Sequence, residues 1–298
     1  MSRKFIYFIN PISGTGSKGR LRQLIESRTN AAGHAYEILD TRADGDYGFL
    51  PGKIQLEKVT DVVICGGDGT VNQVSAALQG VAVHVGIIPM GSGNGLALAA
   101  GIPVSSEKAL DIVFRGKASY IDGFYINNRF SCMLCGLGFD AAVAHEFARQ
   151  KKRGLLTYVK LTLKHFFSAK PFPFVLHIKG MVISTEAFFI SIANSNQFGN
   201  NVTIAPRASI SDGLLDIVVV KKMSKMKLLY SLAHQIKLGQ ITNTEKKFHH
   251  RDIFYFQTKQ LQIDNLSEAP LHIDGDPSGT CSRFEISIVE KAFKLLQP

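Results

Sequence analysis

The first 115 residues alternate between short apolar runs and polar segments of helical character. The apolar runs have the length and continuity of buried strands, at residues 4–9, 35–39, 61–65 and 83–88. The helical segments cover residues 18–30, residues 71–78 and the stretch that begins at residue 96. This alternation predicts a parallel sheet with helices on both faces, because parallel strands need a crossover to connect them.

The pattern changes after residue 119, where short β-rich runs separated by turn residues dominate and predict an antiparallel sandwich or barrel. The expected strands are 120–126, 130–134, 174–179, 186–193, 214–220, 261–264, 271–273 and 284–289. The expected helices are 140–150, 157–167 and 225–238. We therefore expect two domains, α/β over residues 1–119 and mostly β over residues 120–289.

The composition indicates that the chain can bury a hydrophobic core, and its apolar stretches are too short to span a membrane. Hydrophobic residues make up 45% of the 298 residues and charged residues 19%. The apolar stretches 187–193 and 214–220 are far shorter than the roughly 18 residues of a spanning helix, and the run 5–9 is too short for a signal peptide. The lone pair Cys132 and Cys135 is expected to be reduced core thiols, so we expect a cytoplasmic protein.

The net charge of +10 is unevenly distributed, with +2 on residues 1–130 and +8 on residues 131–298. A basic half suits an anionic membrane surface or serves solubility alone. Phe166, Phe167 and Phe172 beside lysines form either an insertion edge or part of the core. We expect no nucleic-acid partner, because no recognition-helix motif, zinc finger or stacking-aromatic signature accompanies the charge.

Three glycine-rich loops follow strands of the first domain, where an open parallel sheet places its binding crevice. The loop at 10–19 departs from a P-loop, since Arg20 stands where the lysine belongs. Its GxGxxG pattern, with Asp40 downstream, competes as a dinucleotide fingerprint. Against that reading, Asn10-Pro11 separates the strand from the glycines, and two further glycine loops would go unexplained.

The second and third loops combine glycines with small polar side chains. Glycines 66, 67 and 69 let backbone amides approach phosphate oxygens, and Asp68 among them suits a magnesium ligand or a proton acceptor better than a simple turn. The loop 91–95 adds Ser92 and Asn94 as donors ahead of a helix N-terminus. Three phosphate-compatible loops at one sheet edge imply a nucleoside triphosphate and phosphoryl transfer.

Several ordered motifs resemble the diacylglycerol kinase catalytic family, which includes soluble bacterial lipid kinases, sphingosine kinases and ceramide kinases. The resemblance covers nearly the whole chain. In the first half it rests on Asn10-Pro11, GGDGTVNQV at 66–74 and GSGNGLA at 91–97. In the second half it rests on the segments GLGFD at 136–140, NSNQFG at 194–199, the region 205–216 and HIDGD at 272–276.

The resemblance implies an N-terminal phosphofructokinase- and NAD-kinase-like α/β domain and a C-terminal antiparallel β-sandwich. The active site would lie in the cleft between them, and residues 290–298 would return to the first domain. It implies a lipid kinase that transfers the γ-phosphate of ATP, with Mg²⁺, to a hydroxyl of diacylglycerol, a sphingoid base or a similar lipid at an anionic membrane surface. A peripherally membrane-associated cytoplasmic protein follows, and an oligomer is compatible with the sequence.

The resemblance also assigns roles to particular residues. Asp122 would meet the acceptor, while the carbonyls of Ser209 and Leu214 and the carboxylate of Asp212 would form a structural magnesium site. The residues implied for nucleotide binding are Asn10, Pro11, Ser13, Gly14, Thr41, Gly66, Gly67, Asp68, Gly69, Thr70, Asn72, Gly91, Ser92, Gly93, Asn94, Arg129 and Gly275.

The general base stays open between Asp68 and the segment of Asp274 and Asp276. Asp276 replaces the family's Glu, and its oxygens fall about 1–1.5 Å short of the same point, a scale at which positioning matters. Gln73 likewise replaces a Glu that often follows the second loop. Two other functions remain as alternatives, a kinase for a soluble acceptor in the manner of NAD kinase and a regulatory relative that binds lipid or nucleotide with weakened catalysis.

Overall fold

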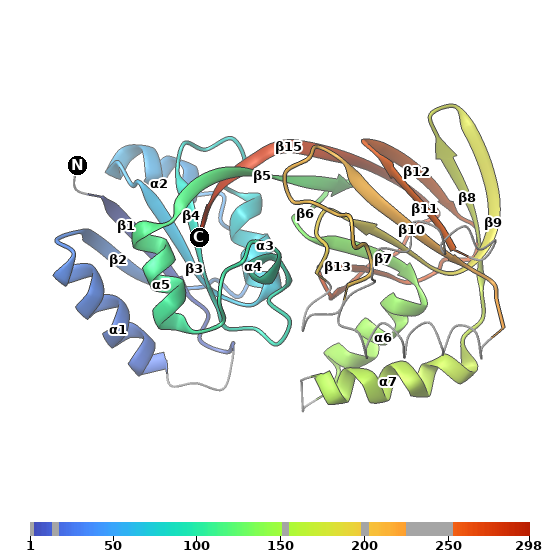
Figure 1. Ribbon diagram of the computed structural model, residues 1–298, viewed down its shortest axis with the longest axis horizontal. Helices are drawn as coiled ribbons and strands as arrows, with labels where there is room; N and C mark the ends of the chain where they lie inside the picture. The colour runs from blue at the N-terminus through green and yellow to red at the C-terminus, as the bar shows by residue number, and fades with distance from the viewer. Residues whose placement is uncertain (1–2, 14–17, 151–154, 198–202, 225–252) are drawn as a thin grey trace. The chain divides into compact units, whose positions relative to one another are not determined.

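The computed structural model describes residues 3–13, 18–150, 155–197, 203–224 and 253–298 (Figure 1). The expected helix at 225–238 lies outside the described residues. The chain divides into two compact units, one formed by Met1–Asp122 with Glu290–Pro298 and the other by Gly123–Val289. Each unit has its own sheet region and its own buried core.

The first unit contains a parallel sheet in the order β4-β3-β1-β2, and the last residues of the chain extend it. Near the C-terminus, Lys294 and Leu295 pair with His84 and Val85 in parallel. The central strands are buried throughout, as expected for a sheet covered on both faces. The strands are β1 (Lys4–Ile9), β2 (Ala35–Asp40), β3 (Asp61–Gly66) and β4 (His84–Pro89).

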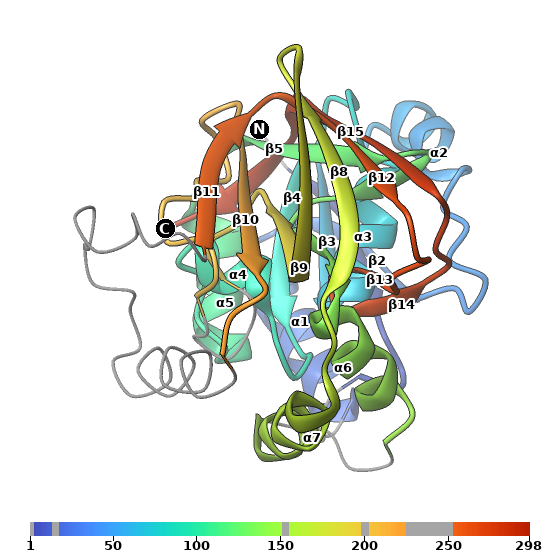
Figure 2. The ribbon, with the colours of Figure 1, turned by 90° about the vertical axis from the view of Figure 1, so that its right-hand side faces the viewer.

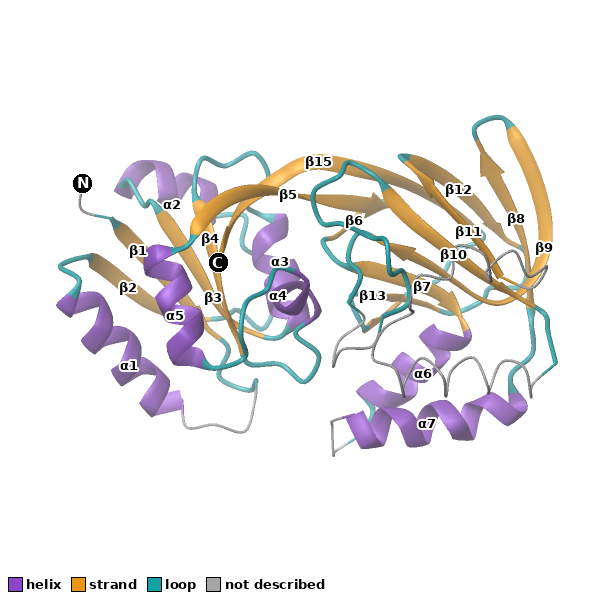
Figure 3. Ribbon diagram, viewed as in Figure 1, coloured by secondary structure: helices purple, strands orange, loops and turns teal. Residues whose placement is uncertain are grey.

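The helices of the first unit connect these strands (Figure 3). They are α1 (Lys18–Ala31), α2 (Leu50–Glu57), α3 (Asp68–Ala76), α4 (Gly95–Ala99) and α5 (Ser106–Arg115). The hydroxyl of Ser105 caps α5 by accepting the amide of Lys108. The helix α2 leaves no clear pattern in the sequence, because only Leu50 and Ile54 of its eight residues are buried and it contains both a proline and a glycine.

The second unit is built mainly from antiparallel strands (Figure 2). Its central strand is β9, which pairs with β8 along its first half and with β7 and β10 along its second. This exchange of partners lets one long strand serve two parts of the sandwich. The strands are β6 (Arg129–Ser131), β7 (Leu134–Gly138), β8 (Phe172–Ile178), β9 (Met181–Ala193), β10 (Leu215–Lys221), β11 (Ile253–Thr258), β12 (Gln260–Asn265), β13 (Leu271–Ile273) and β14 (Asp276–Ser278).

Two strands contain the boundaries between the units, β5 (Lys117–Ile126) and β15 (Arg283–Gln297). The helices α6 (Phe139–Ala148) and α7 (Leu155–Ser168) complete the second unit, and α6 contacts β13 and β14. The expected α/β fold with a parallel sheet, followed by an antiparallel β-sandwich, is confirmed.

One expected strand is divided. The run 130–134 was expected to be continuous, but β6 ends at Ser131 and β7 begins at Leu134. The strand is interrupted here because the amides of Met133 and Leu134 donate to the carboxylate of Asp274 rather than to a neighbouring strand. The short strands β11 and β14 were not anticipated either.

The apolar candidates for membrane insertion are mostly core residues. Phe166 is 1% exposed, and Phe172 is partly buried against the core of the second unit. Phe166 therefore does not form an insertion edge, while the side chain of Phe167 lies outside the described part of the chain. Within the described residues, no helix is long and apolar enough to cross a membrane. Cys132 and Cys135 are buried free thiols, as expected.

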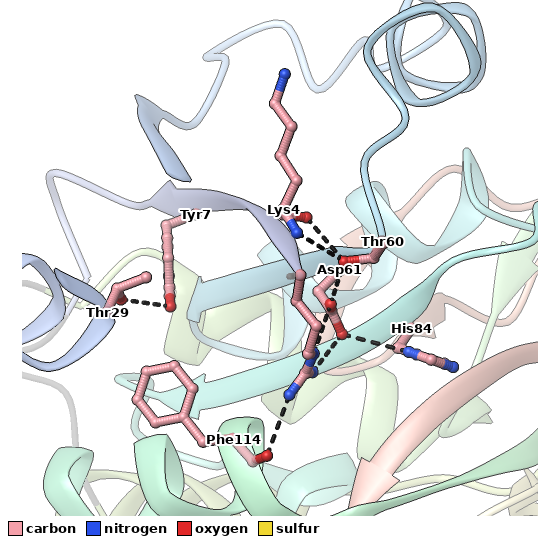
Figure 4. A network of polar contacts seen from close by, with 8 residues as sticks. Lys4, Tyr7, Thr29, Thr60, Asp61, His84 and Phe114 are labelled. Atoms are coloured by element: carbon pink, nitrogen blue, oxygen red, sulfur yellow. Dashed lines mark hydrogen bonds and ion pairs between the residues drawn. The ribbon is translucent and has the colours of Figure 1, made fainter. Parts of the chain in front are cut away.

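A buried carboxylate ties several elements of the first unit together at the amino ends of β3 and β4 (Figure 4). Asp61 is fully buried; Arg3 donates to both of its oxygens, and Thr60 Oγ1 donates to Oδ2 at 2.6 Å. His84 Nδ1 lies 3.4 Å from Oδ1. Arg3 also donates to the carbonyl of Phe114, at 3.1 Å, so the network joins β1, β3, β4 and α5.

Replacing Asp61 by Ala is expected to lower the free energy of unfolding by about 3 kcal/mol, because it leaves the partly buried Arg3 without its partner. Urea denaturation followed by circular dichroism measures the change. Asp40→Ala is the matched control, since its ion pair with Arg22 is exposed and is worth below about 1 kcal/mol. Equal losses in the two variants would contradict this role for Asp61.

Candidate active site

Loops at the carboxyl ends of β1, β3 and β4 meet at one edge of the parallel sheet (Figure 3). Asn10 connects the first two loops. Its Nδ2 donates to Thr70 Oγ1 at 2.8 Å, and its Oδ1 accepts the amides of Ile12 and Ser13 at 3.0 and 3.2 Å. One side chain thus forms a turn over residues 10–13 and anchors it to the first turn of α3.

The second and third loops come into backbone contact. A Cβ at position 91 would lie 2.6 Å from the Cα of Gly67, closer than any side chain allows. A Cβ at Gly66 would lie 2.7 Å from the Cβ of Thr70. These positions require glycine, because a side chain there would collide with the neighbouring loop or with Thr70.

Asn94 and Asp68 fix the third loop. Asn94 has φ of 54°, and its side chain both accepts the amide and donates to the carbonyl of Gly91, each at 2.8 Å. Asp68 is the first residue of α3, and its Oδ1 accepts the amide of Gly95 at 2.7 Å. Asp68 therefore links the beginnings of α3 and α4, a structural task that its place in the glycine loop alone did not reveal.

The remaining predicted nucleotide ligands of the first unit lie on the same edge. Thr41 follows β2, and its amide donates to the carbonyl of Ile9 at 3.0 Å. Gly14 lies outside the described residues. The other positions that the structure places on these loops or on the first turns of α3 are Pro11, Ser13, Gly69, Thr70, Asn72, Ser92 and Gly93.

In the second unit, Asp274 and Gly275 form the two-residue turn between β13 and β14. Their φ angles are 50° and 85°, so both lie in the left-handed region that such hairpin turns use. Asp274 Oδ1 accepts Ser131 Oγ at 2.6 Å, the amide of Leu134 at 2.9 Å and that of Met133 at 3.3 Å. Oδ2 is buried and has no hydrogen-bond partner among the described residues.

Burial raises the pKa of Asp274 to about 6, against the opposing effect of its hydrogen bonds. A carboxylate that titrates near neutral pH and keeps one oxygen unengaged is suited to accept a proton. Asp276, the second carboxylate of the turn, is exposed on β14. Of the two, only Asp274 combines desolvation with an oriented carboxylate.

Two further predicted residues lie on β5 and β6. Arg129 donates to the hydroxyl of Ser278 on β14 and so lies beside the Asp274 turn. Asp122 is 3% exposed, and its Oδ1 accepts the amide of Lys291 at 2.8 Å. The contact of Asp122 with an acceptor stays a prediction.

The predicted metal ligands lie in the loop before β10. Asp212 Oδ1 accepts the amide of Leu214 at 3.1 Å, and Gly213 between them has φ of 71°. Among the described residues, no group of three or more His, Cys, Asp or Glu could hold a metal ion. A site here would therefore use one carboxylate with the carbonyls of Ser209 and Leu214, a hard oxygen donor set that fits Mg²⁺.

Ser131, which is not part of any predicted site, is fully buried against Asp274. Its partner lies 143 residues away in the chain, and no local pattern announces such a contact. His272 was quoted within a motif, but nothing in the sequence shows that its ring is buried beside Asp140, at 3.3 Å.

Comparisons with known proteins match both halves of the chain. The diacylglycerol kinase catalytic domain matches residues 4–126, and the YegS C-terminal NAD kinase beta sandwich-like domain matches residues 134–297. A diacylglycerol kinase of Mycobacterium tuberculosis is 30% identical over 305 residues, covering 97% of this chain and 93% of the relative. The chain belongs to the diacylglycerol kinase family.

Other relatives carry similar names. A diacylglycerol kinase of Bacillus subtilis is 25% identical over 91% of this chain and 88% of the relative. A YegS-like lipid kinase of Shewanella frigidimarina is 28% identical over 81% and 78%. The crystal structure of a diacylglycerol kinase from Bacillus anthracis has a TM-score of 0.75 at 20% identity, with 99% of this chain and 97% of that chain covered, so it shows the same fold. The protein is a phosphotransferase of the diacylglycerol kinase family.

Asp274→Asn is expected to remove the cost of burying a charge in this kinase. The folded state raises the pKa of Asp274 to about 6 from 3.8, so it binds the proton more tightly than the unfolded chain. Wild-type stability therefore falls as pH rises from about 4 to about 6, by up to about 3 kcal/mol, and the penalty is full above that range. The Asn variant lacks this pH-dependent loss of stability.

Urea unfolding of both proteins between pH 4 and 8 tests this. The unfolding free energy of the variant minus that of wild type should increase from pH 4 to pH 6 and stay constant above pH 6. Asp276→Asn is the control, since it makes the same chemical change at an exposed position. A stability difference between Asp274→Asn and wild type that is the same at pH 4 and pH 8 would contradict the burial cost.

Proposed function

We propose that the protein is an ATP-dependent lipid kinase that transfers the γ-phosphate of ATP, with Mg²⁺, to a hydroxyl of diacylglycerol, a sphingoid base or a similar lipid. The observation that carries the proposal is the buried Asp274 carboxylate, which keeps Oδ2 unengaged in a chain of the diacylglycerol kinase family. Such a group accepts the proton of an alcohol at neutral pH.

The loops of the first unit would bind the nucleotide. The backbone contact of Gly67 with Gly91, and the tie of Asn10 to Thr70, hold the loop amides in place before a ligand arrives. Preformed amides stabilise phosphate charge without reorganisation during the reaction. The carboxylate of Asp212, with the carbonyls of Ser209 and Leu214, would hold Mg²⁺ in a structural role. The Mg²⁺ that accompanies ATP would neutralise phosphate charge.

Asp274 would act as the general base. Its Oδ2 accepts the proton of the lipid hydroxyl as the hydroxyl oxygen forms a bond to the γ-phosphorus, the bond to the bridging oxygen breaks, and ADP leaves. Oδ1 holds the carboxylate in one orientation through its three donors. Asp68 is less suited, since it is only partly buried, and Asp276 is exposed.

The protein would bind peripherally to the cytoplasmic side of an anionic membrane and meet its lipid substrate there. The +8 charge on residues 131–298 supports this, since each basic residue near such a surface contributes about 1 kcal/mol. On α7, Leu163 is 43% exposed and lies between the exposed Lys160 and Lys164. Leu163 takes the place of Phe166 as the apolar candidate for membrane contact.

Phosphate transfer from γ-labelled ATP, with Mg²⁺, to mixed micelles of diacylglycerol, sphingosine, ceramide or a total lipid extract tests the proposal. Asp274→Asn should lower kcat about 10²–10⁴-fold, the range for loss of a general base, while ATP binding measured by calorimetry stays unchanged. Asp276→Asn makes the same chemical change two residues away and should keep kcat within a few-fold of wild type.

Three outcomes contradict parts of the proposal. If no lipid accepts label although soluble alcohols do, the acceptor class is wrong. If ATP binds and no acceptor is labelled, the protein is a non-catalytic relative. If Asp276→Asn or Asp68→Asn removes transfer while Asp274→Asn keeps it, the base is assigned to the wrong carboxylate.

A further inference from the structure

A second carboxylate and a histidine are buried next to the turn that carries Asp274. His272 is fully buried on β13, and its Nε2 lies 3.3 Å from Oδ2 of Asp140 near the start of α6. Asp140 is 6% exposed, and its Oδ1 accepts the amide of Ala141 at 2.8 Å. An anionic side chain at the N-terminal turn of a helix is favourably placed. The function proposed above makes no use of this pair.

The segment GLGFD at 136–140 is shaped around the pair. A Cβ at position 136 would lie 1.9 Å from Asp140 Oδ2 and 2.5 Å from His272 Nε2, so only glycine leaves room for the two polar side chains. Gly138, with φ of 100°, is the residue before α6, and its amide donates to the carbonyl of Pro270 at 2.9 Å. The two glycines therefore bring the helix start against β13.

The other ring nitrogen of His272 faces the catalytic turn. The amide of Gly275 donates to His272 Nδ1 at 3.3 Å. Because Nδ1 accepts, the proton of the neutral ring is on Nε2, from which it is donated to Asp140. A chain of contacts thus runs from Asp140 through His272 to the amide that follows Asp274.

We propose that His272, oriented by Asp140, is a positioning residue that fixes the Asp274–Gly275 turn and so holds Asp274 Oδ2 in place for the acceptor hydroxyl. The inference rests on the proposed function. Asp274 and Gly275 adopt the left-handed φ angles of a two-residue hairpin turn, which the Asp-Gly dipeptide favours. The contact from Gly275 to His272 restrains this turn on one side, and the contacts of Oδ1 restrain it on the other.

Three variants separate the two contacts of the ring. His272→Phe keeps a ring of similar size and removes both contacts. In His272→Asn the side-chain oxygen takes the place of Nδ1 and can still accept the amide of Gly275. In His272→Gln the side-chain amide takes the place of Nε2 and can contact only Asp140. The matched control is His145→Gln, since His145 on α6 contacts the carbonyl of Leu271 at 2.7 Å but not the turn.

The expected result is a 10- to 100-fold loss of kcat in His272→Phe and His272→Gln, with KM for ATP within two-fold of wild type. His272→Asn should recover at least a third of the wild-type kcat, and His145→Gln should stay within three-fold. Rates are normalised to the folded protein, measured by circular dichroism. A normalised kcat equal to wild type in His272→Phe, or no recovery in His272→Asn, overturns the inference.

Hydrogen exchange of the hairpin 271–278, measured by mass spectrometry without any substrate, tests the same inference independently of activity. Exchange should be faster in His272→Phe than in wild type, and slower in His272→Asn than in His272→Phe. If wild type phosphorylates no lipid but exchange follows this order, the proposed function fails and the positioning of the turn stands. If wild type is active and exchange is equal in all variants, the positioning fails.

Discussion

The carboxylate of Asp274 is bound through one of its two oxygens, and the junction between β6 and β7 is arranged around it. Three donors from Ser131, Met133 and Leu134 bind Oδ1, which divides β6 from β7. Oδ2 is buried with no hydrogen-bond partner in the part of the chain that the structure describes, and burial raises the pKa of Asp274 to about 6. The proposed proton acceptor therefore costs the protein stability at neutral pH.

Glycine serves two different purposes in the two units. In the first unit, Gly67 and Gly91 let two loop backbones touch. In the second unit, Gly136 makes room for two buried polar side chains. Both sets fall in motifs of similar appearance, G-x-G or GG, so only the neighbouring atoms distinguish a ligand loop from a packing contact.

Local patterns predicted the architecture well, because alternating strands and helices, or strands and turns, leave periodic traces in the chain. They failed where a long-range contact decided the outcome. The division at Ser131 depends on Asp274, and burial of Phe166 depends on how α6 and α7 pack. The sequence pattern predicted that the three loops lie at one edge of the sheet. It did not decide which of three carboxylates is the base, because the burial of Asp274 and the exposure of Asp276 are properties of the folded chain.

The most direct test of Asp274 as the base is the pH dependence of kcat/KM for the lipid, expressed as the ratio of wild type to Asp274→Asn. The ratio removes ionisations that both proteins share, including those of the nucleotide. It should rise about tenfold per pH unit below pH 6 and level off above, because the pKa of Asp274 is about 6. A ratio that is constant from pH 5 to pH 8 would contradict the account.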